Sequence, residues 1–346
     1  MDKSLLRIYI QTQIFPKTGG GANWIESYEG YDQLIATRTE GEHVISGYDT
    51  VNITHYQDGD KALLHSEKGT LKLSANNVTL KGASASGSGD GPILIHAYGG
   101  KIDVEATNDI VIAAGKNNAV MSQAVPGKGD SLVKLHADGN ITITAEGTGN
   151  TISVAMLQSK MSGLTSGLDI HAGGDVTILS QNGAALQVFN KTEKYQGDDG
   201  HADVKVAADG NLTLHGKTYG LFQAMQVDGA NSTANGTYTA GKKIDIYGDQ
   251  LGVYMTSPIA GNKALIDAPE INISTQNSRG DLAAIYARDN ANLTLGNGSD
   301  TRQINISADQ GFAISGASSS TITFNKSNTF VNGKTYSEGT LQLNNT

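Results

Sequence analysis

The chain of 346 residues contains no cysteine, only five prolines and a single tryptophan. The absence of cysteine excludes a disulfide scaffold, although a long repeat protein can be stable without one. No apolar run reaches the length of about 18 residues that a membrane-spanning helix needs. The first residues, interrupted by Arg7, also lack the apolar stretch of a signal peptide. We therefore expect no membrane span in this chain.

Positive charge is scarce as well, because 25 Lys and Arg face 34 Asp and Glu, which gives a net charge of −9. No Lys/Arg-rich run or basic, aromatic-lined segment is present, so we expect no nucleic-acid partner. The hydrophobic share of 38% is low for a large globular core. The 43 glycines, together with many Thr, Val, Ile and Asn, indicate short strands and frequent turns.

The most regular feature of the sequence is an apolar-x-apolar triplet that recurs nine times at intervals of 27 to 36 residues. The copies begin at Val51, Val78, Ile110, Ile141, Val176, Leu212, Ile244, Ile271 and Ile304. Self-similarity at a period of about 32 residues is typical of a stacked repeat architecture. One such unit cannot bury its own apolar face, so the units must stack. We call these triplets strand B.

Two further triplets belong to each repeat. Strand A precedes strand B by seven or eight residues, with copies at 71–73, 102–104, 133–135, 168–170 and 204–206 and weaker ones at 264–266 and 293–295. Strand C follows strand B, with copies at Ala119-Val120-Met121, 152–154, 186–188, 253–255, Ala284-Ile285-Tyr286 and 312–314. The short A-to-B links are rich in Gly, Asn and Asp, which accept positive φ and suit tight corners.

These patterns predict an all-β fold, a right-handed parallel β-helix with three short strands per coil of about 32 residues and roughly ten coils. The outward middle positions of strand A support this register, because Lys72, Asp103, Lys134, Asp169 and Lys205 alternate in charge from coil to coil. Opposite charges on neighbouring strands are the favourable cross-strand choice. Residues 1–43 lack the repeat, so we expect an N-terminal cap and irregular first coil there. Residues 44–346 form the solenoid, and Thr340-Leu341-Gln342-Leu343 suggests that the natural chain continues.

Candidate binding residues fall in the C-to-A links, which are long in five successive coils at about 122–131, 157–167, 190–203, 226–236 and 256–263. Insertions on one corner of a solenoid stack into a ridge that often binds a partner. The richest insertion offers Lys191, Lys194, Tyr195, Asp198, Asp199 and His201. The integrin-recognition tripeptide Arg279-Gly280-Asp281 is a second candidate. The alternative is that these loops are merely tolerated surface insertions.

Catalytic and metal-binding alternatives are weaker. Asp103 and Asp169 lie two coils apart, which suits an inverting glycosidase, but Lys134 between them would keep both ionised. Asp58-Gly59-Asp60, and Asp198-Asp199 with Asp203, are acidic turns without calcium-loop spacing. His136 and His171 share a register, and His96 recurs near strand A, but a zinc site needs three or four ligands. We expect no metal and no cofactor.

The segments Asp203-Val204-Lys205-Val206-Ala207-Ala208-Asp209-Gly210-Asn211-Leu212-Thr213-Leu214 and Ala283-Ala284-Ile285-Tyr286-Ala287 resemble the passenger regions of Gram-negative autotransporter and haemagglutinin-like adhesins. The resemblance covers roughly residues 44–330. It implies type V secretion, display on the bacterial cell surface and a role in adhesion. The chain lacks the family's signal peptide, translocator barrel and serine-protease Gly-Asp-Ser-Gly motif.

We therefore expect a non-catalytic, extracellular adhesin rod. Its partners would be a host glycan, a matrix protein or a neighbouring cell surface, and self-association is a further expectation. Weak, repeated contacts along such a rod would gain strength by avidity. The alternatives are a polysaccharide lyase or glycoside hydrolase on the same fold, and a phage tail-fibre or surface-layer element.

Overall fold

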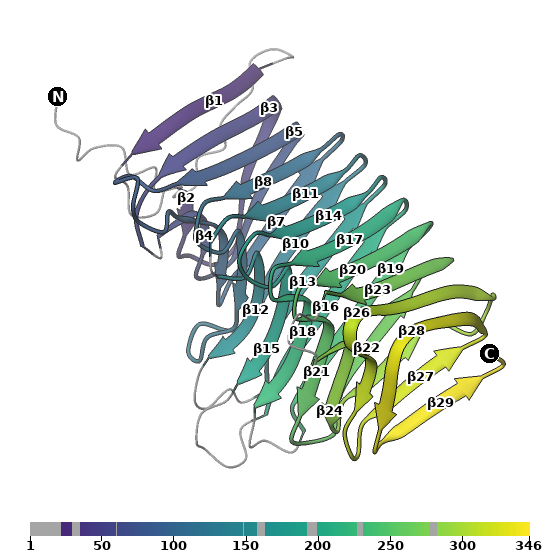
Figure 1. Cartoon of the computed structure of the whole chain (residues 1–346). Coiled ribbons are helices and arrows are strands. Elements are labelled where there is room, and N and C mark those ends of the chain that lie inside the picture. Colours follow the sequence, from purple (N-terminus) through teal and green to yellow (C-terminus); the bar gives the residue numbers. More distant parts are fainter. Residues whose placement is uncertain are drawn as a thin grey trace, which may run out of the picture.

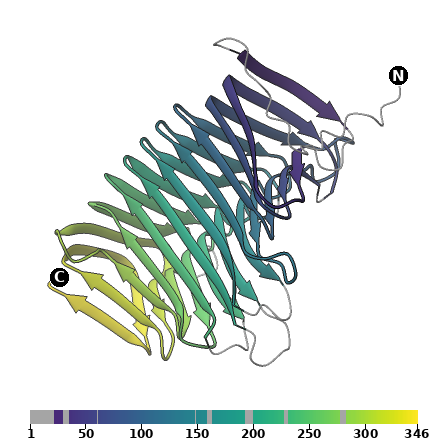
Figure 2. The ribbon, with the colours of Figure 1, turned by 180° about the vertical axis from the view of Figure 1, so that it is seen from behind.

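The computed structural model describes residues 22–29, 35–59, 61–147, 149–157, 163–191, 199–226, 231–276 and 282–346. Every regular element in these residues is a β-strand, and none is a helix. The strands wind into a right-handed parallel β-helix, as the repeat predicted. Figures 1 and 2 show the coils stacked side by side from the purple N-terminal part to the yellow C-terminal part, so that the molecule is a single rod.

Three ladders of parallel strands form the faces of the rod. The B ladder runs through β1 (Ala22–Glu29), β3 (Glu42–Tyr56), β5 (Thr70–Ala83), β8 (Ile110–Ala114), β11 (Ile141–Ala145), β14 (Val176–Ser180), β17 (Asn211–Gly216), β20 (Lys243–Gly248), β23 (Glu270–Thr275), β26 (Arg302–Gly316) and β28 (Ser327–Ser337). The long strands β3 and β5 also pass through the A-to-B corner, while β26 and β28 continue into the C face.

The A ladder begins with the first halves of β3 and β5. It continues through β7 (Lys101–Ala106), β10 (Ser131–Ala137), β13 (Leu164–Ala172), β16 (Gly200–Ala208), β19 (Thr233–Ala240), β22 (Asn262–Asp267), β25 (Asn292–Leu295), β27 (Thr321–Asn325) and β29 (Thr340–Asn344).

The C ladder comprises β2 (Ile35–Thr37), β4 (Ala62–Ser66), β6 (Ile93–Tyr98), β9 (Val120–Gln123), β12 (Ile152–Leu157), β15 (Leu186–Lys191), β18 (Tyr219–Gln226), β21 (Leu251–Ser257), β24 (Ala283–Asp289) and the second halves of β26 and β28.

The core is a set of aliphatic columns along the rod axis. In the B ladder, Ile141 lies beside Val176 and Ile143 beside Ile178, and all four side chains are fully buried. The middle residue of each triplet, such as Thr142 between Ile141 and Ile143, points outward and is half-buried. Burying one such aliphatic side chain stabilises the fold by about 1.5–3 kcal/mol. The period-2 alternation of the triplets therefore fixes which face of every strand is inward.

The A-to-B corners are held by a hydrogen-bond ladder that runs from coil to coil. The backbone nitrogen of Gly174 donates to the carbonyl of Gly139 (2.8 Å), and that of Gly210 donates to Gly174 (2.9 Å). The side chains repeat the pattern, because the Asp175 nitrogen donates to Asn140 Oδ1 (2.9 Å) and the Asn211 nitrogen to Asp175 Oδ1 (2.7 Å). This ladder explains why the three links at 139–140, 174–175 and 210–211 carry glycine followed by Asn or Asp.

Glycine was expected at these corners because it accepts positive φ, and this reason was wrong. Positive φ does not occur at Gly139, Gly174 or Gly210. A Cβ built on Gly139 would instead lie 2.4 Å from Asp109 Oδ1 and 2.7 Å from the carbonyl oxygen of Asn108. Glycine is needed there because the backbones of neighbouring coils approach closely, not because of its left-handed conformation.

Two parts of the predicted strand pattern also need correction. The triplet pattern missed strand β19 of the A ladder, because its buried Tyr238 lies where other coils have an aliphatic residue. Two strand-C triplets were displaced by one residue, since Val120 pairs with Ile152 and Ile285 with Val253. Consecutive buried residues lie at the start of both strands, at Ala119-Val120 and Ala283-Ala284-Ile285, which blurs the period-2 alternation there.

Near the N-terminal end, β1 pairs with β3 and β2 pairs with β4. Ile35 of β2 is fully buried, so part of the segment before residue 44 already stacks on the solenoid. The described residues contain no helix that is long and apolar enough to cross a membrane.

Candidate functional site

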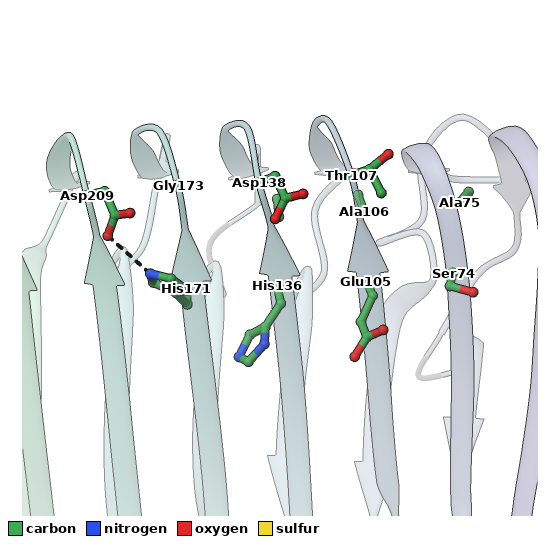
Figure 3. Close-up of a pocket in the computed structure, with 11 residues that line it drawn as sticks. Ser74, Ala75, Glu105, Ala106, Thr107, His136, Asp138, His171, Gly173 and Asp209 are labelled. Atoms are coloured by element: carbon green, nitrogen blue, oxygen red, sulfur yellow. Dashed lines mark hydrogen bonds and ion pairs between the residues drawn. The ribbon is translucent and has the colours of Figure 1, made fainter.

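The strand-A face carries two shallow depressions. The first has a volume of about 460 Å³ and lies where the A strands enter the A-to-B turns (Figure 3). Its polar lining consists of Ser74, Glu105, Thr107, His136, Asp138, His171 and Asp209. Figure 3 shows Glu105 and His136 on adjacent strands below the turns, with Asp138 and Asp209 above them. Residues from five successive coils therefore contribute to one polar surface.

Two imidazoles form the centre of the first depression. His136 pairs in register with Glu105 on one side and His171 on the other. The two imidazole rings meet edge to face with centroids 6.0 Å apart. His171 Nε2 lies 3.2 Å from Asp209 Oδ1, the dashed contact in Figure 3, and His136 Nε2 lies 3.5 Å from Asp169 Oδ2. Each imidazole thus has a carboxylate nearby, at hydrogen-bond distance for His171 but without a hydrogen bond for His136 Nε2.

The second depression lies at the beginning of the same A strands and has a volume of about 490 Å³. Its charged and polar lining includes Lys101, Asp130, Thr165, Asp169, Asp203, Lys205 and Asn235. Gly167 keeps the surface low, because a Cβ there would lie 2.9 Å from Leu132 Cδ1. Since Asp169 lines this depression and contacts His136 of the first, the two depressions meet at that pair.

The predicted charge ladder is present on the same face. Lys134 lies between Asp103 and Asp169 in the register, and Lys205 follows Asp169. Lys134 Nζ is 3.7 Å from Asp103 Oδ2, and the Asp103 side chain is only 10% exposed. This pairing explains how a carboxylate can be nearly buried on an outward position. At the N-terminal end, a hydrogen bond from Lys72 to Glu42 raises the pKa of Lys72.

The chemistry of the strand-A face follows from these contacts. It presents carboxylates, ammonium groups and imidazoles in alternation, on a shallow surface that extends over several coils. Within the described residues, no group of three or more His, Cys, Asp or Glu is arranged to hold a metal ion. An extended polar ligand lying along the rod axis fits such a surface better than a compact one, because the depressions are shallow and in line.

The residues predicted in the 190–203 insertion have different outcomes. Asp199 accepts hydrogen bonds from the backbone nitrogen and Nδ2 of Asn231, both at 3.0 Å. His201 Nδ1 is 2.9 Å from Thr233 Oγ1. Both side chains thus contact the next coil, and neither lines the two depressions.

The remaining predicted binding residues are not placed by their side chains. Lys191 is the last residue of β15, and Lys194, Tyr195 and Asp198 lie outside the described residues. The tripeptide Arg279-Gly280-Asp281 also lies outside them. Binding at these positions therefore remains a prediction.

The acidic turn at Asp58 is a structural hydrogen-bonding site. Its carboxylate accepts hydrogen bonds from Ser84 Oγ (2.5 Å) and from the backbone nitrogen of Ser86 (3.1 Å). The hydrogen bond from Ser84, opposed by partial desolvation, lowers the pKa of Asp58. The interpretation of this segment as an acidic turn fits these contacts, and Asp60 lies outside the described residues.

An aromatic surface on the C face was missed from the sequence. We define the aromatic strip as Phe189, Tyr219, Phe222, Tyr254 and Tyr286. Phe222, Tyr254 and Tyr286 occupy the same register position on β18, β21 and β24. Their 32-residue spacing equals the repeat length. The displaced register at Ala284-Ile285-Tyr286 hid this signal, because it assigned Tyr286 to the inward set.

A second missed cluster lies on the same face nearer the N-terminus. His96 was expected near strand A, but it belongs to strand C and pairs with His65 of the preceding coil. Glu67 lies 3.4 Å from His65 Nε2, and Lys128 contacts both Glu67 and the Tyr98 ring. Burial lowers the pKa of His65, and that of His96 to about 3.

Comparison of the chain with protein-family models, with curated proteins and with solved structures found no match in any of the three.

Proposed function

We propose that this protein is a non-catalytic rod of a bacterial surface adhesin, which binds host or neighbouring-cell ligands along its faces. The observation that carries the proposal is the pair of shallow depressions that meet at His136 and Asp169 on the strand-A face. An elongated, charge-bearing surface suits a polymeric polar ligand, which contacts several coils at once. Each contact is weak, and binding strength comes from their number.

Export and surface display belong to the same proposal. They are supported by the resemblance to autotransporter passengers and by the rod shape, which would carry a binding face away from a cell surface. Self-association of rods would be compatible with adhesion between neighbouring cells.

The direct test is binding of the purified rod to arrays of glycans and matrix proteins. Thr165 lines the second depression, so Thr165→Arg should obstruct it and weaken binding at least roughly tenfold, as loss of a few favourable contacts would. Thr177→Arg places the same side chain outward on the B face and is the matched control. Equal binding by both variants, or no binding by the unmodified rod, would contradict the proposal.

A glycan-degrading enzyme is the second candidate, and the His136–Asp169 pair is the observation that favours it. An imidazole beside a carboxylate is a common arrangement for general acid–base chemistry. Turnover of neutral or uronate-containing polysaccharides that Asp169→Asn abolishes would establish this alternative. Binding without turnover on the same panel would favour the adhesin.

A further inference from the structure

We propose that the aromatic strip on the C face binds a neutral, extended glycan whose chain runs along the rod axis. This proposal goes beyond the proposed function, because the aromatic strip lies on the C ladder and not on the strand-A face, and because it takes a different class of ligand. It uses ring surfaces and uncharged polar groups, whereas the strand-A depressions are lined with charged groups.

The strip is continuous over four coils. Ring centroids are 6.1 Å apart between Phe189 and Phe222, 5.1 Å between Phe222 and Tyr254, and 5.5 Å between Tyr254 and Tyr286. The planes of these pairs differ by only 23–26°. The rings are therefore stacked on one another along the rod axis, at separations typical of aromatic pairs. All five rings of the strip are half-buried, neither enclosed nor fully exposed.

Ring spacing favours a sugar polymer over a compact ligand. Parallel strands repeat at about 4.8 Å along the axis, which is close to the rise of one sugar in an extended chain. A sugar chain that runs along the axis can therefore contact the solvent-facing side of each ring in turn through its apolar C–H groups. Tyr219 lies beside this column, with its centroid 5.3 Å from Phe222 and 5.8 Å from Tyr254, and widens the platform at its centre.

Polar groups at the ends of the ring column suit sugar hydroxyl groups. Gln187 precedes Phe222 and Ser315 follows Tyr286 at the same outward position. The tyrosine rings add phenolic hydroxyls, which both donate and accept hydrogen bonds. Aromatic faces flanked by amide and hydroxyl groups match the alternation of apolar and polar edges on a sugar ring.

Charge on the strip favours a neutral glycan over an acidic one. Arg288 is the cation at its C-terminal end, with its guanidinium 5.8 Å from the centre of the Tyr286 ring. Its neighbour Asp289 adds a negative charge at the same end of β24. The chain as a whole carries a net charge of −9, which disfavours association with a polyanion.

The rings can be removed without disturbing the core, because the core is formed by the inward residues of the same strands and the rings occupy the outward positions. Leu221 and Val253, which directly precede the outward Phe222 and Tyr254, are fully buried and pair with each other across the ladder. The double variant Tyr254→Ser/Tyr286→Ser therefore tests the outer surface alone. Tyr247→Ser is the matched control, since Tyr247 is a half-buried outward tyrosine on β20 of the B face.

The experiment is isothermal titration of the full chain with neutral β-linked oligosaccharides of two to six sugars, alongside uronate oligosaccharides of equal length. Affinity should rise with length until the four coils are covered. The double variant should lose at least roughly tenfold in affinity, the effect of removing two ring contacts, while Tyr247→Ser should bind like the unmodified chain. Circular dichroism and thermal melting confirm that each variant is folded.

The proposal would be overturned by no binding of any neutral oligosaccharide, by unchanged affinity of the folded double variant, or by tighter binding of the uronates. Capture of a protein ligand through Tyr254 and Tyr286 in place of the oligosaccharides would overturn it as well. The proposed function is tested separately, because Thr165→Arg alters only the strand-A face. Loss of array binding in that variant with oligosaccharide binding intact would separate the two sites.

Discussion

The imidazole rings of His65 and His96 meet edge to face on neighbouring strands, with centroids 5.2 Å apart. Nδ1 of His65 and Nε2 of His96 are buried and have no hydrogen-bond partner. A proton on either ring would place a charge beside Lys128, with Glu67 as the nearby carboxylate. Burial therefore favours the neutral form of both rings in the folded protein.

This pair predicts acid sensitivity of the fold. An imidazole has a pKa near 6.5 in the unfolded chain, and burial lowers that of His96 to about 3. Between these pH values His96 is protonated in the unfolded state but not in the folded state. The free energy of unfolding is therefore highest above pH 6.5 and falls as the pH drops towards 3. At pH 5, the free energy of unfolding should be roughly 2 kcal/mol lower than at pH 7.5 on account of His96 alone.

Urea denaturation at the two pH values measures this difference. His96→Phe keeps an aromatic ring and removes the titrating group, so its stability should depend less on pH. His171→Gln, which removes a more exposed imidazole on the strand-A face, is the control. If His96→Phe shows the same loss between pH 7.5 and 5 as the unmodified chain, the buried pair is not its source.

The inward and outward positions of strand B should differ sharply in tolerance. Ile143 is fully buried between Ile112 and Ile178, whereas Thr142 beside it points outward. Ile143→Asp buries an unpaired charge and should cost several kcal/mol or prevent folding. Thr142→Asp should change the free energy of unfolding by about 0.5 kcal/mol or less. Similar melting temperatures for the two variants would refute the assignment of faces.

Much of this fold could be predicted because a solenoid repeats one local pattern. The triplet spacing predicted which strands stack, and the signs at Lys72, Asp103 and Lys134 predicted the register of the A face. Tyr238 could not be predicted in the same way. Its ring fits the aliphatic column only because Gly236 has no Cβ, which would lie 2.6 Å from the ring. A search for periodic apolar residues cannot detect such a compensation between two positions.

The candidate sites were harder to predict than the fold. A surface site depends on which outward residues of different coils become neighbours, and one misplaced residue in a strand changes that assignment. The aromatic strip was lost in this way at Tyr286. The pairing of His65 with His96 was missed because His96 was grouped with His136 and His171 near strand A, and His65, which lies 31 residues before it, was not considered.

Tight packing at the A-to-B corner predicts that Gly139 and Gly115, which follows the B strand β8, are not equivalent. In Gly139→Ala the new methyl group would meet Asp109 Oδ1 and the backbone of Asn108, so the corner must shift, at a cost of about 1–3 kcal/mol. Gly115→Ala is the matched control, since its nearest contact would be at 3.4 Å. That variant should be neutral or stabilised by up to about 1 kcal/mol. Equal melting temperatures would contradict the hydrogen-bond ladder as the reason for glycine at position 139.

The buried polar network behind the C-to-A corner should be more costly to break at its centre than at its edge. Gln223 Nε2 donates to the Ala234 carbonyl (3.0 Å), to Asn262 Oδ1 (2.8 Å) and to the Lys263 carbonyl (2.7 Å). Its Oε1 accepts a hydrogen bond from the Tyr238 hydroxyl at 3.1 Å. Burial raises the pKa of Tyr238, so this hydroxyl stays protonated and remains a donor.

Tyr238→Phe removes one hydrogen bond and should cost about 1 kcal/mol. Gln223→Leu takes the donor from Asn262 Oδ1 and the acceptor from the Tyr238 hydroxyl, both in a buried network, and should cost roughly 3 kcal/mol or more. In the combined variant the second change should cost less than it does alone, because the partners left by Gln223 include the hydroxyl that Phe removes. Urea denaturation of the three variants measures this coupling, and strictly additive costs would show that Tyr238 and Gln223 act independently.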